Sequence, residues 1–166
     1  TPHIVVGEND NIYHLWYDGS GWQNETVVSG ASGNIAAVAL AADSYSNLYV
    51  AYKLDNSQDP VKLTTKSGGS WSTPEDVSGI GNSPADEGGI CLHLFVVGSK
   101  VVVLARLDGG RVRSVAKSGG TWEDAVVLQR GSFTAASDGT SVHIFFARDV
   151  SAGLGRSGGC YFPWQQ

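Results

Sequence analysis

Carboxylates and guanidinium groups that converge on one place can bind hydroxyl groups, bind an anion or hold a cation. The adjacent acids Asp86 and Glu87 form the least repeated acidic pair of the chain. Two such carboxylates can act as acid and base or bind calcium, although neighbouring residues of an extended chain point in opposite directions. The other charged candidates are Arg130, Asp108, Arg111, Arg113 and Asp149. These side chains suit a hydroxyl-rich ligand better than an apolar one, but loop Asp residues also bond to their own backbone and can be purely structural.

No catalytic set emerges beside these candidates. The sequence contains no recognisable Ser/His/Asp arrangement, and His93 and His143 lie in apolar runs that favour core positions. The spacing of Cys and His residues does not fit a zinc site. Cys91 and Cys160 could pair with each other or be small buried apolar residues. We therefore predict no catalytic residue, no metal ligand and no cofactor, with calcium near Asp86 and Glu87 as the open alternative.

An internal repeat shows how the candidates are positioned. Residues 66–71, 117–122 and 156–161 each read cation-Ser-Gly-Gly-small-aromatic, and residues 18–22 form a shorter relative. A second series of apolar runs, each closed by Asp, lies in phase with the first series. Its members are residues 11–18, 47–55, 100–108 and 141–149. Two series in phase indicate a repeated structural unit.

Each repeat unit has the pattern of an antiparallel four-stranded sheet. Alternation with a period of two dominates, and no segment keeps a helical period for three turns. The Ala-rich residues 36–42 are also expected to be a strand, because the innermost strand of a radial blade needs small side chains. Four strands in about 40–50 residues, repeated, are typical of a β-propeller. The fold class is therefore all-β, a single propeller domain with blades at residues 1–30, 31–83, 84–131 and 132–166.

The repeated aromatic residues have a structural role in this arrangement. We expect Trp22, Trp71, Trp122 and Tyr161 to lie between adjacent blades. The first blade shows three strand patterns and lacks an innermost one. The chain is then either part of a larger propeller or a subunit of a homodimer that closes the ring, with a compact four-blade monomer as the remaining alternative. The charged candidates fall on loops between the second and third strands or between blades, which share one face of a propeller.

Composition excludes several functional classes. The chain has 166 residues, a formal net charge of -5 and a sequence pI of about 5.2. This balance argues against a nucleic-acid partner, which would need a basic face. No apolar stretch approaches the ~20 residues of a membrane-spanning helix, so no membrane insertion is expected.

The repeated turn resembles the Asp-box, or bacterial neuraminidase repeat, of sialidase-like propellers, whose pattern is Ser-x-Asp-x-Gly-x-x-Trp. Residues 64–71 keep a hydroxyl, Gly68 and Trp71, whereas Lys66 stands at the position of the Asp. Residues 13–22 are also similar to blades of tectonin-type sugar-binding propellers. Asp-box turns lie away from the active face in that family, so the resemblance implies a fold rather than a reaction. The arginine triad, the Tyr–Glu nucleophile and the acidic residue of such sialidases cannot be mapped onto this chain.

We therefore expect a carbohydrate-binding or adhesion propeller with shallow glycan sites, and a glycan or polysaccharide as its partner. Two alternatives stay open: a fragment or subunit of a sialidase-like glycoside hydrolase or lyase, and a scaffold propeller that binds protein. The absent catalytic set favours binding over catalysis for this chain alone. An extracellular or cell-surface location of bacterial type is the accompanying expectation.

Overall fold

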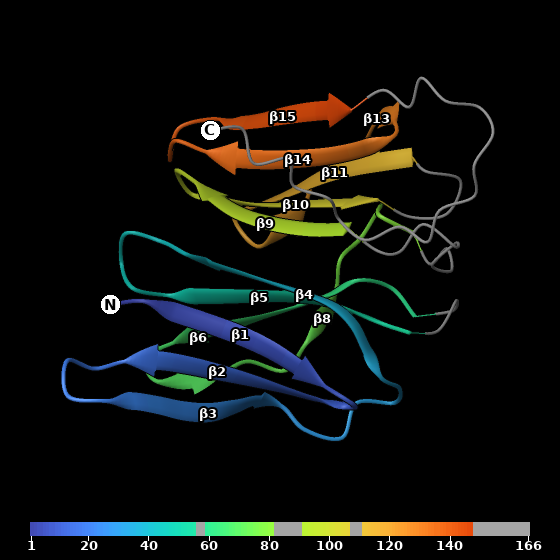
Figure 1. Ribbon diagram of the computed structural model, residues 1–166. Coiled ribbons are helices and arrows are strands. Elements are labelled where there is room, and N and C mark those ends of the chain that lie inside the picture. Colours follow the sequence, from blue (N-terminus) through green and yellow to red (C-terminus); the bar gives the residue numbers. More distant parts are fainter. Residues whose placement is uncertain (56–58, 82–90, 107–110, 148–166) are drawn as a thin grey trace.

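The computed structural model describes residues 1–55, 59–81, 91–106 and 111–147. Within these ranges every regular element is a β-strand, and every strand pairing is antiparallel. The strands form four successive sheets that stack along the chain (Figure 1). The protein is thus all-β, with its sheets arranged as blades of a partial β-propeller.

Each sheet is built from strands that are consecutive in sequence. The first sheet, in the order β1-β2-β3, contains β1 His3–Glu8, β2 Asn11–Tyr17 and β3 Trp22–Val28. The second contains β4 Ile35–Ala42, β5 Leu48–Leu54, β6 Lys62–Ser67, β7 Ser70–Trp71 and β8 Glu75–Asp76. The third contains β9 Cys91–Val97, β10 Lys100–Arg106, β11 Arg111–Ser118, β12 Thr121–Trp122 and β13 Val126–Arg130. The described part of the fourth contains β14 Ser132–Ser137 and β15 Val142–Ala147.

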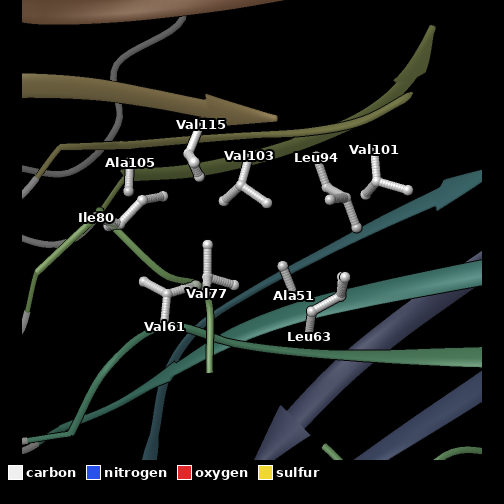
Figure 2. Close-up of a cluster of buried hydrophobic side chains, with 10 residues drawn as sticks. All are labelled: Ala51, Val61, Leu63, Val77, Ile80, Leu94, Val101, Val103, Ala105 and Val115. Atoms are coloured by element: carbon white, nitrogen blue, oxygen red, sulfur yellow. The ribbon is translucent and has the colours of Figure 1, made fainter. Parts of the chain in front are cut away.

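Three hydrophobic clusters join the four sheets face to face. Ile12 and Val27 of the first sheet pack with Val50 and Tyr52 of the second. The cluster between the second and third sheets is drawn in Figure 2, where its side chains point toward one another from both sides. It consists of Ala51, Val61, Leu63, Val77, Ile80, Leu94, Val101, Val103, Ala105 and Val115. A third cluster joins the third sheet to the fourth through Leu104 and Phe133 among others.

The sequence of the central strand β5 is almost uniformly apolar because both faces of its sheet are covered. Val50, Tyr52 and Leu54 face the first sheet, while the intervening Ala51 faces the third. Successive side chains of a strand point to opposite faces, so a sheet covered on both sides must be apolar at every position. A sheet that is stacked between two others therefore needs apolar runs like those that recur in the repeat.

The first sheet lacks a counterpart of the inner strand β4. Its tight β2–β3 turn corresponds to the β6–β7 turn, because Trp22 pairs with Tyr17 as Trp71 pairs with Lys66. The end of β1 meets the start of β4, where a Cβ added to Gly7 would lie 2.6 Å from Ile35 Cγ2. Figure 1 shows β1 and β4 running in opposite directions, so β1 corresponds to β5. Three strands form, as expected for residues 1–30, but residues 11–18 take the place of β6 rather than that of β5, so the second repeat series does not hold for the first sheet.

The tight turns need the repeated Gly-Gly pair. Gly68 and Gly69 have φ values of 62° and 99°, and Gly119 and Gly120 have values of 57° and 87°. These are left-handed conformations that residues with a Cβ rarely adopt. The turns bring Trp71 and Trp122 back against their own third strands. The expected fourth-blade counterpart, with a third strand near Leu154 and Tyr161 after the turn, lies outside the described residues.

Candidate functional site

A cleft of about 550 Å³ opens between the first and second sheets. Its walls come from the start of β1, the end of β2, the β4–β5 turn, and the end of β6 with its Gly-Gly turn. The lining residues are Thr1, His3, His14, Trp16, Ala42, Asp43, Ser46, Leu48, Lys66, Gly68 and Gly69. Because residues i and i+2 of a strand share a face, β2 presents both His14 and Trp16 to this cleft.

Glu25, on the adjacent strand β3, organises the polar side of the cleft. Its Oε1 accepts hydrogen bonds from His14 Nδ1 at 2.9 Å, Lys66 Nζ at 2.6 Å and Trp71 Nε1 at 3.1 Å. Its Oε2 accepts a further bond from Lys66 Nζ at 2.7 Å. Since Lys66 and Trp71 belong to the second sheet, this carboxylate ties the two sheets together.

The surroundings of Glu25 favour its charged form. Burial by itself would raise the pKa of Glu25, but the hydrogen bonds from Lys66, His14 and Trp71 together lower it below its usual value. The pKa of His3 is also lowered, first by burial and then by the positive charge of its neighbours. His3 Nδ1 lies 2.8 Å from Nε2 of the fully buried His14. The cleft thus holds a continuous hydrogen-bonded chain from His3 through His14 to Glu25.

Aromatic rings form the apolar side of the same cleft. The Trp16 ring stacks on His14, with centroids 5.1 Å apart and planes within 18° of each other. Lys66 Nζ lies 5.6 Å from the centroid of the Trp16 ring and 6.0 Å from that of Trp71. A cation at this distance from a ring face is attracted by the π-system. The arrangement offers a half-buried indole beside charged hydrogen-bonding groups.

The same set of residues recurs one sheet later. Lys117 pairs with Glu75 and lies 5.5 Å from the ring centroid of Trp122. The strand registers make this a true repeat: Glu25 pairs with His14 in the first sheet, Glu75 with Leu63 in the second, and Val126 with Ser114 in the third. Twice, therefore, a Glu on the outer strand of one sheet pairs with a Lys of the next sheet, and that Lys lies beside a Trp; only Glu25 also accepts a hydrogen bond from the Trp.

Two other carboxylates, Asp43 at the cleft and Asp18 after β2, are used by turns. Asp43 accepts hydrogen bonds from the backbone of Tyr45 and Asn47 and from the Tyr49 hydroxyl. Asp18 accepts hydrogen bonds from the Ser20 side chain and from the Ser20 and Gly21 backbone, which lower its pKa to about 2. Both Asp residues stabilise local structure, as expected for loop carboxylates.

The loop residues proposed from the sequence are only partly described. Asp86, Glu87, Asp108 and Asp149 lie outside the described residues. Arg111 is exposed at the start of β11 and pairs in register with Arg130 of β13. Arg113 lines a second cleft of about 440 Å³, and its Nη1 donates to the carbonyls of Gly79 and Ile80.

The repeated aromatic residues occupy different environments. Trp71 packs against the cluster between the first two sheets, and Trp122 packs against the cluster of Figure 2. Trp122 Nε1 is buried and has no hydrogen-bond partner among the described residues. Trp22 is 53% exposed and contacts Tyr17 of its own sheet, which differs from the buried position expected for it. Tyr161 lies outside the described residues.

Sequence reasoning did not select His3, His14 or Glu25. The one available signal was Lys66, which stands in the repeated turn where a neutral or acidic residue would also fit. Buried Lys53 was missed as well; its Nζ donates to the Leu54 carbonyl, and burial lowers its pKa against the effect of Asp59 and Asp55. Lys53 lies in the apolar run at residues 47–55, whereas Lys66 belongs to the repeated turn at residues 66–71.

No group of three or more His, Cys, Asp or Glu side chains in the described ranges is arranged to hold a metal ion. Cys91 is buried, with its Sγ 3.6 Å from His93 Nε2, while Cys160 lies outside those ranges. The described segments also contain no helix capable of crossing a membrane.

No protein-family model and no curated protein matches the sequence. Among solved structures, AofleA from Arthrobotrys oligospora is similar, with a TM-score of 0.53, 12% identity, and coverage of 87% of this chain and 39% of that chain. A triple arginine mutant of AofleA gives a TM-score of 0.54 and 11% identity, and the match covers 82% of this chain and 37% of the mutant chain. A mutant of NanB sialidase from Streptococcus pneumoniae gives a TM-score of 0.48 and 13% identity. That match covers 72% of this chain and 19% of the sialidase chain. The chain thus spans less than two fifths of AofleA, and the likeness to AofleA supports the propeller-like fold alone.

Proposed function

We propose that this chain is a carbohydrate-binding propeller module and that a sugar binds in the cleft between the first and second sheets. The observation that carries the proposal is the pairing, in one cleft, of the Trp16 indole with the polar groups of His3 and Lys66. A sugar ring has an apolar face of C–H groups and a rim of hydroxyls, so it needs both kinds of partner.

Two further observations support this assignment. The cleft volume of about 550 Å³ falls within the usual range of small-ligand sites. The Glu–Lys–Trp set between the second and third sheets offers the basis for a second, weaker site. Two such sites would act together on a glycan-coated surface.

A glycan array followed by calorimetry with a binding glycan tests the proposal. Trp16→Ala should weaken binding at least about tenfold, because it removes the aromatic surface of the cleft; tenfold corresponds to about 1.4 kcal/mol. Phe145→Ala is the matched control, since Phe145 is 63% exposed on β15 of the fourth sheet, far along the stack from the cleft. Its affinity should equal that of the unmodified chain.

The proposal fails if no glycan on a broad array binds, or if Trp16→Ala and Phe145→Ala lose affinity equally. Turnover of a fluorogenic glycoside at an ordinary enzymatic rate would instead favour the glycoside hydrolase alternative. Circular dichroism of both variants shows whether each retains the β-sheet signal, so loss of folding is distinguished from loss of the site.

A further inference from the structure

The hydrogen-bonded chain in the cleft fixes where protons lie. An ionised carboxylate can only accept hydrogen bonds, and Glu25 accepts them from Lys66 and Trp71 as well as from His14. His14 must therefore carry its proton on Nδ1. In neutral His14 the other nitrogen, Nε2, is then an acceptor, and it lies 2.8 Å from His3 Nδ1. His3 consequently donates from Nδ1 and leaves its own Nε2 without a proton.

His3 and His14 both line the cleft, and His3 is the exposed end of this chain. Its Nδ1 is occupied by His14, and among the described residues its Nε2 makes no hydrogen bond. The ring planes of His3 and His14 lie within 7° of each other, with centroids 5.1 Å apart. His14 itself is 2% exposed, so a proton from solvent reaches the pair through His3.

We propose that uptake of one proton by the His3–His14 pair converts His3 Nε2 from a hydrogen-bond acceptor into a donor toward the ligand in the cleft. The conversion does not depend on which ring carries the charge. If His3 becomes the imidazolium, both of its nitrogens carry protons. If His14 becomes the imidazolium, its Nε2 donates to His3 Nδ1, and neutral His3 then holds its proton on Nε2.

The charged groups around the pair set the range in which this happens. Glu25 of β3, Lys66 of β6, Asp43 of the β4–β5 turn and the amino group of Thr1 face the pair or line the cleft with it. Burial and the positive neighbours lower the pKa of His3 below its usual value of 6.5. When His3 itself takes the proton, donor behaviour therefore begins below the usual pKa of a His side chain.

The change selects between two classes of sugar. A neutral sugar hydroxyl can both donate and accept, so it fits His3 Nε2 in either state. A carboxylate can only accept, so it is disfavoured beside an unprotonated Nε2 and forms a charge-assisted hydrogen bond after protonation. This consequence rests on the proposed sugar-binding function, whereas the conversion of His3 does not.

Imidazole nitrogen NMR on the full chain tests the conversion without a ligand. Signals are assigned by comparison with His3→Gln, a substitution at an exposed position. At pH 8 we expect a protonated Nδ1 on His14 and an unprotonated Nε2 on His3, and this Nε2 should gain a proton on acidification to pH 5. A proton on His3 Nε2 already at pH 8, or an unprotonated His14 Nδ1, would overturn the proposal.

Calorimetry with D-glucuronate and methyl glucoside tests the consequence, because a carboxylate stays ionised from pH 5 to pH 8. Glucuronate should bind about tenfold more tightly at pH 5 than at pH 8, while the affinity for methyl glucoside should change less than twofold. His3→Gln should abolish the pH effect on glucuronate. An unchanged pH effect in His3→Gln contradicts the assignment to His3. Absence of binding by either sugar, together with the expected NMR titration, refutes the sugar-binding function for these probes and leaves the conversion standing.

Discussion

Glu25 shows how one side chain can join two sheets. It accepts hydrogen bonds from a strand of its own sheet through His14 and from the next sheet through Lys66 and Trp71. Its side chain is 24% exposed and that of Lys66 is 20% exposed, so water screens the pair only in part. Hydrogen bonds to a charged group of this kind are stronger than those between neutral groups.

We predict that Glu25→Gln lowers the free energy of unfolding by about 1–3 kcal/mol, because Lys66 and His14 lose a charged partner. Glu123→Gln is the matched control: Glu123 pairs with Lys100, but both side chains are nearly half exposed, so its loss should cost less than about 1 kcal/mol. Urea unfolding of the two variants measures the difference. Equal losses would show that the Glu25 network does not hold the sheets together.

The sequence contained half of this network. Lys66 and Trp71 were found because they recur at fixed positions in the repeated turn. Glu25 was not found, because its partner Lys66 is 41 residues away and the contact arises only when the sheets stack. The same limit applies to His3 and His14, whose hydrogen bond depends on the β1–β2 register, which pairs His14 with Val5 and His3 with Trp16. The loop candidates came from topology alone, and most of them lie outside the described residues.

Individual elements were more predictable than contacts between them. The apolar run at residues 48–54 became β5 Leu48–Leu54, and the Ala-rich run at 36–42 became part of β4. The outer strands were less regular than expected: the polar fourth strand of the second sheet is split into β7 and β8. Pro74, which has no N–H to donate, lies between the two pieces, but the outer strand of the third sheet is split into β12 and β13 at residues 123–125 without a Pro. Strand patterns predict burial, but they do not show where an edge strand is interrupted.

The Gly-Gly turns offer a test at this scale. Gly68→Ala should lower the free energy of unfolding by about 1 kcal/mol or more, because Gly68 has a φ of 62° and an L-residue is strained there. No atom lies within 4 Å of the added Cβ, so the effect isolates backbone conformation from packing. Gly21→Ala is the control: its surroundings are equally open and its φ lies outside the left-handed region. Thermal unfolding of both variants should show a loss for Gly68→Ala alone; a matching loss at Gly21 would count against the turn argument.

At the scale of the whole molecule, no other sheet in the described part of the chain covers one apolar face of the first sheet. Its register places Tyr17 opposite Trp22 and Ile4 opposite Leu15, so these side chains share a face. The exposed fractions are 53% for Trp22, 45% for Ile4 and 37% for Tyr17. The equivalent face of the second sheet, which carries Trp71, is covered by the first sheet. The repeat therefore implies that another sheet would cover Trp22 in the same way.

We predict that the isolated chain associates with a second copy through this face, as expected for a homodimer that extends or closes the propeller. Trp22→Glu should shift the chain toward the monomer, because a charge buried under a neighbouring sheet would be costly. Tyr45→Glu is the control, since Tyr45 is 85% exposed in the β4–β5 turn and should leave the association unchanged. Sedimentation velocity over a range of micromolar concentrations measures the association of the unmodified chain and of the two variants. A monomeric unmodified chain at every concentration would contradict the prediction, and equal effects of both substitutions would place the contact elsewhere. If Trp22→Glu alone dissociates the assembly, the exposed Trp22 acts as a further inter-blade aromatic residue, equivalent to Trp71 and Trp122.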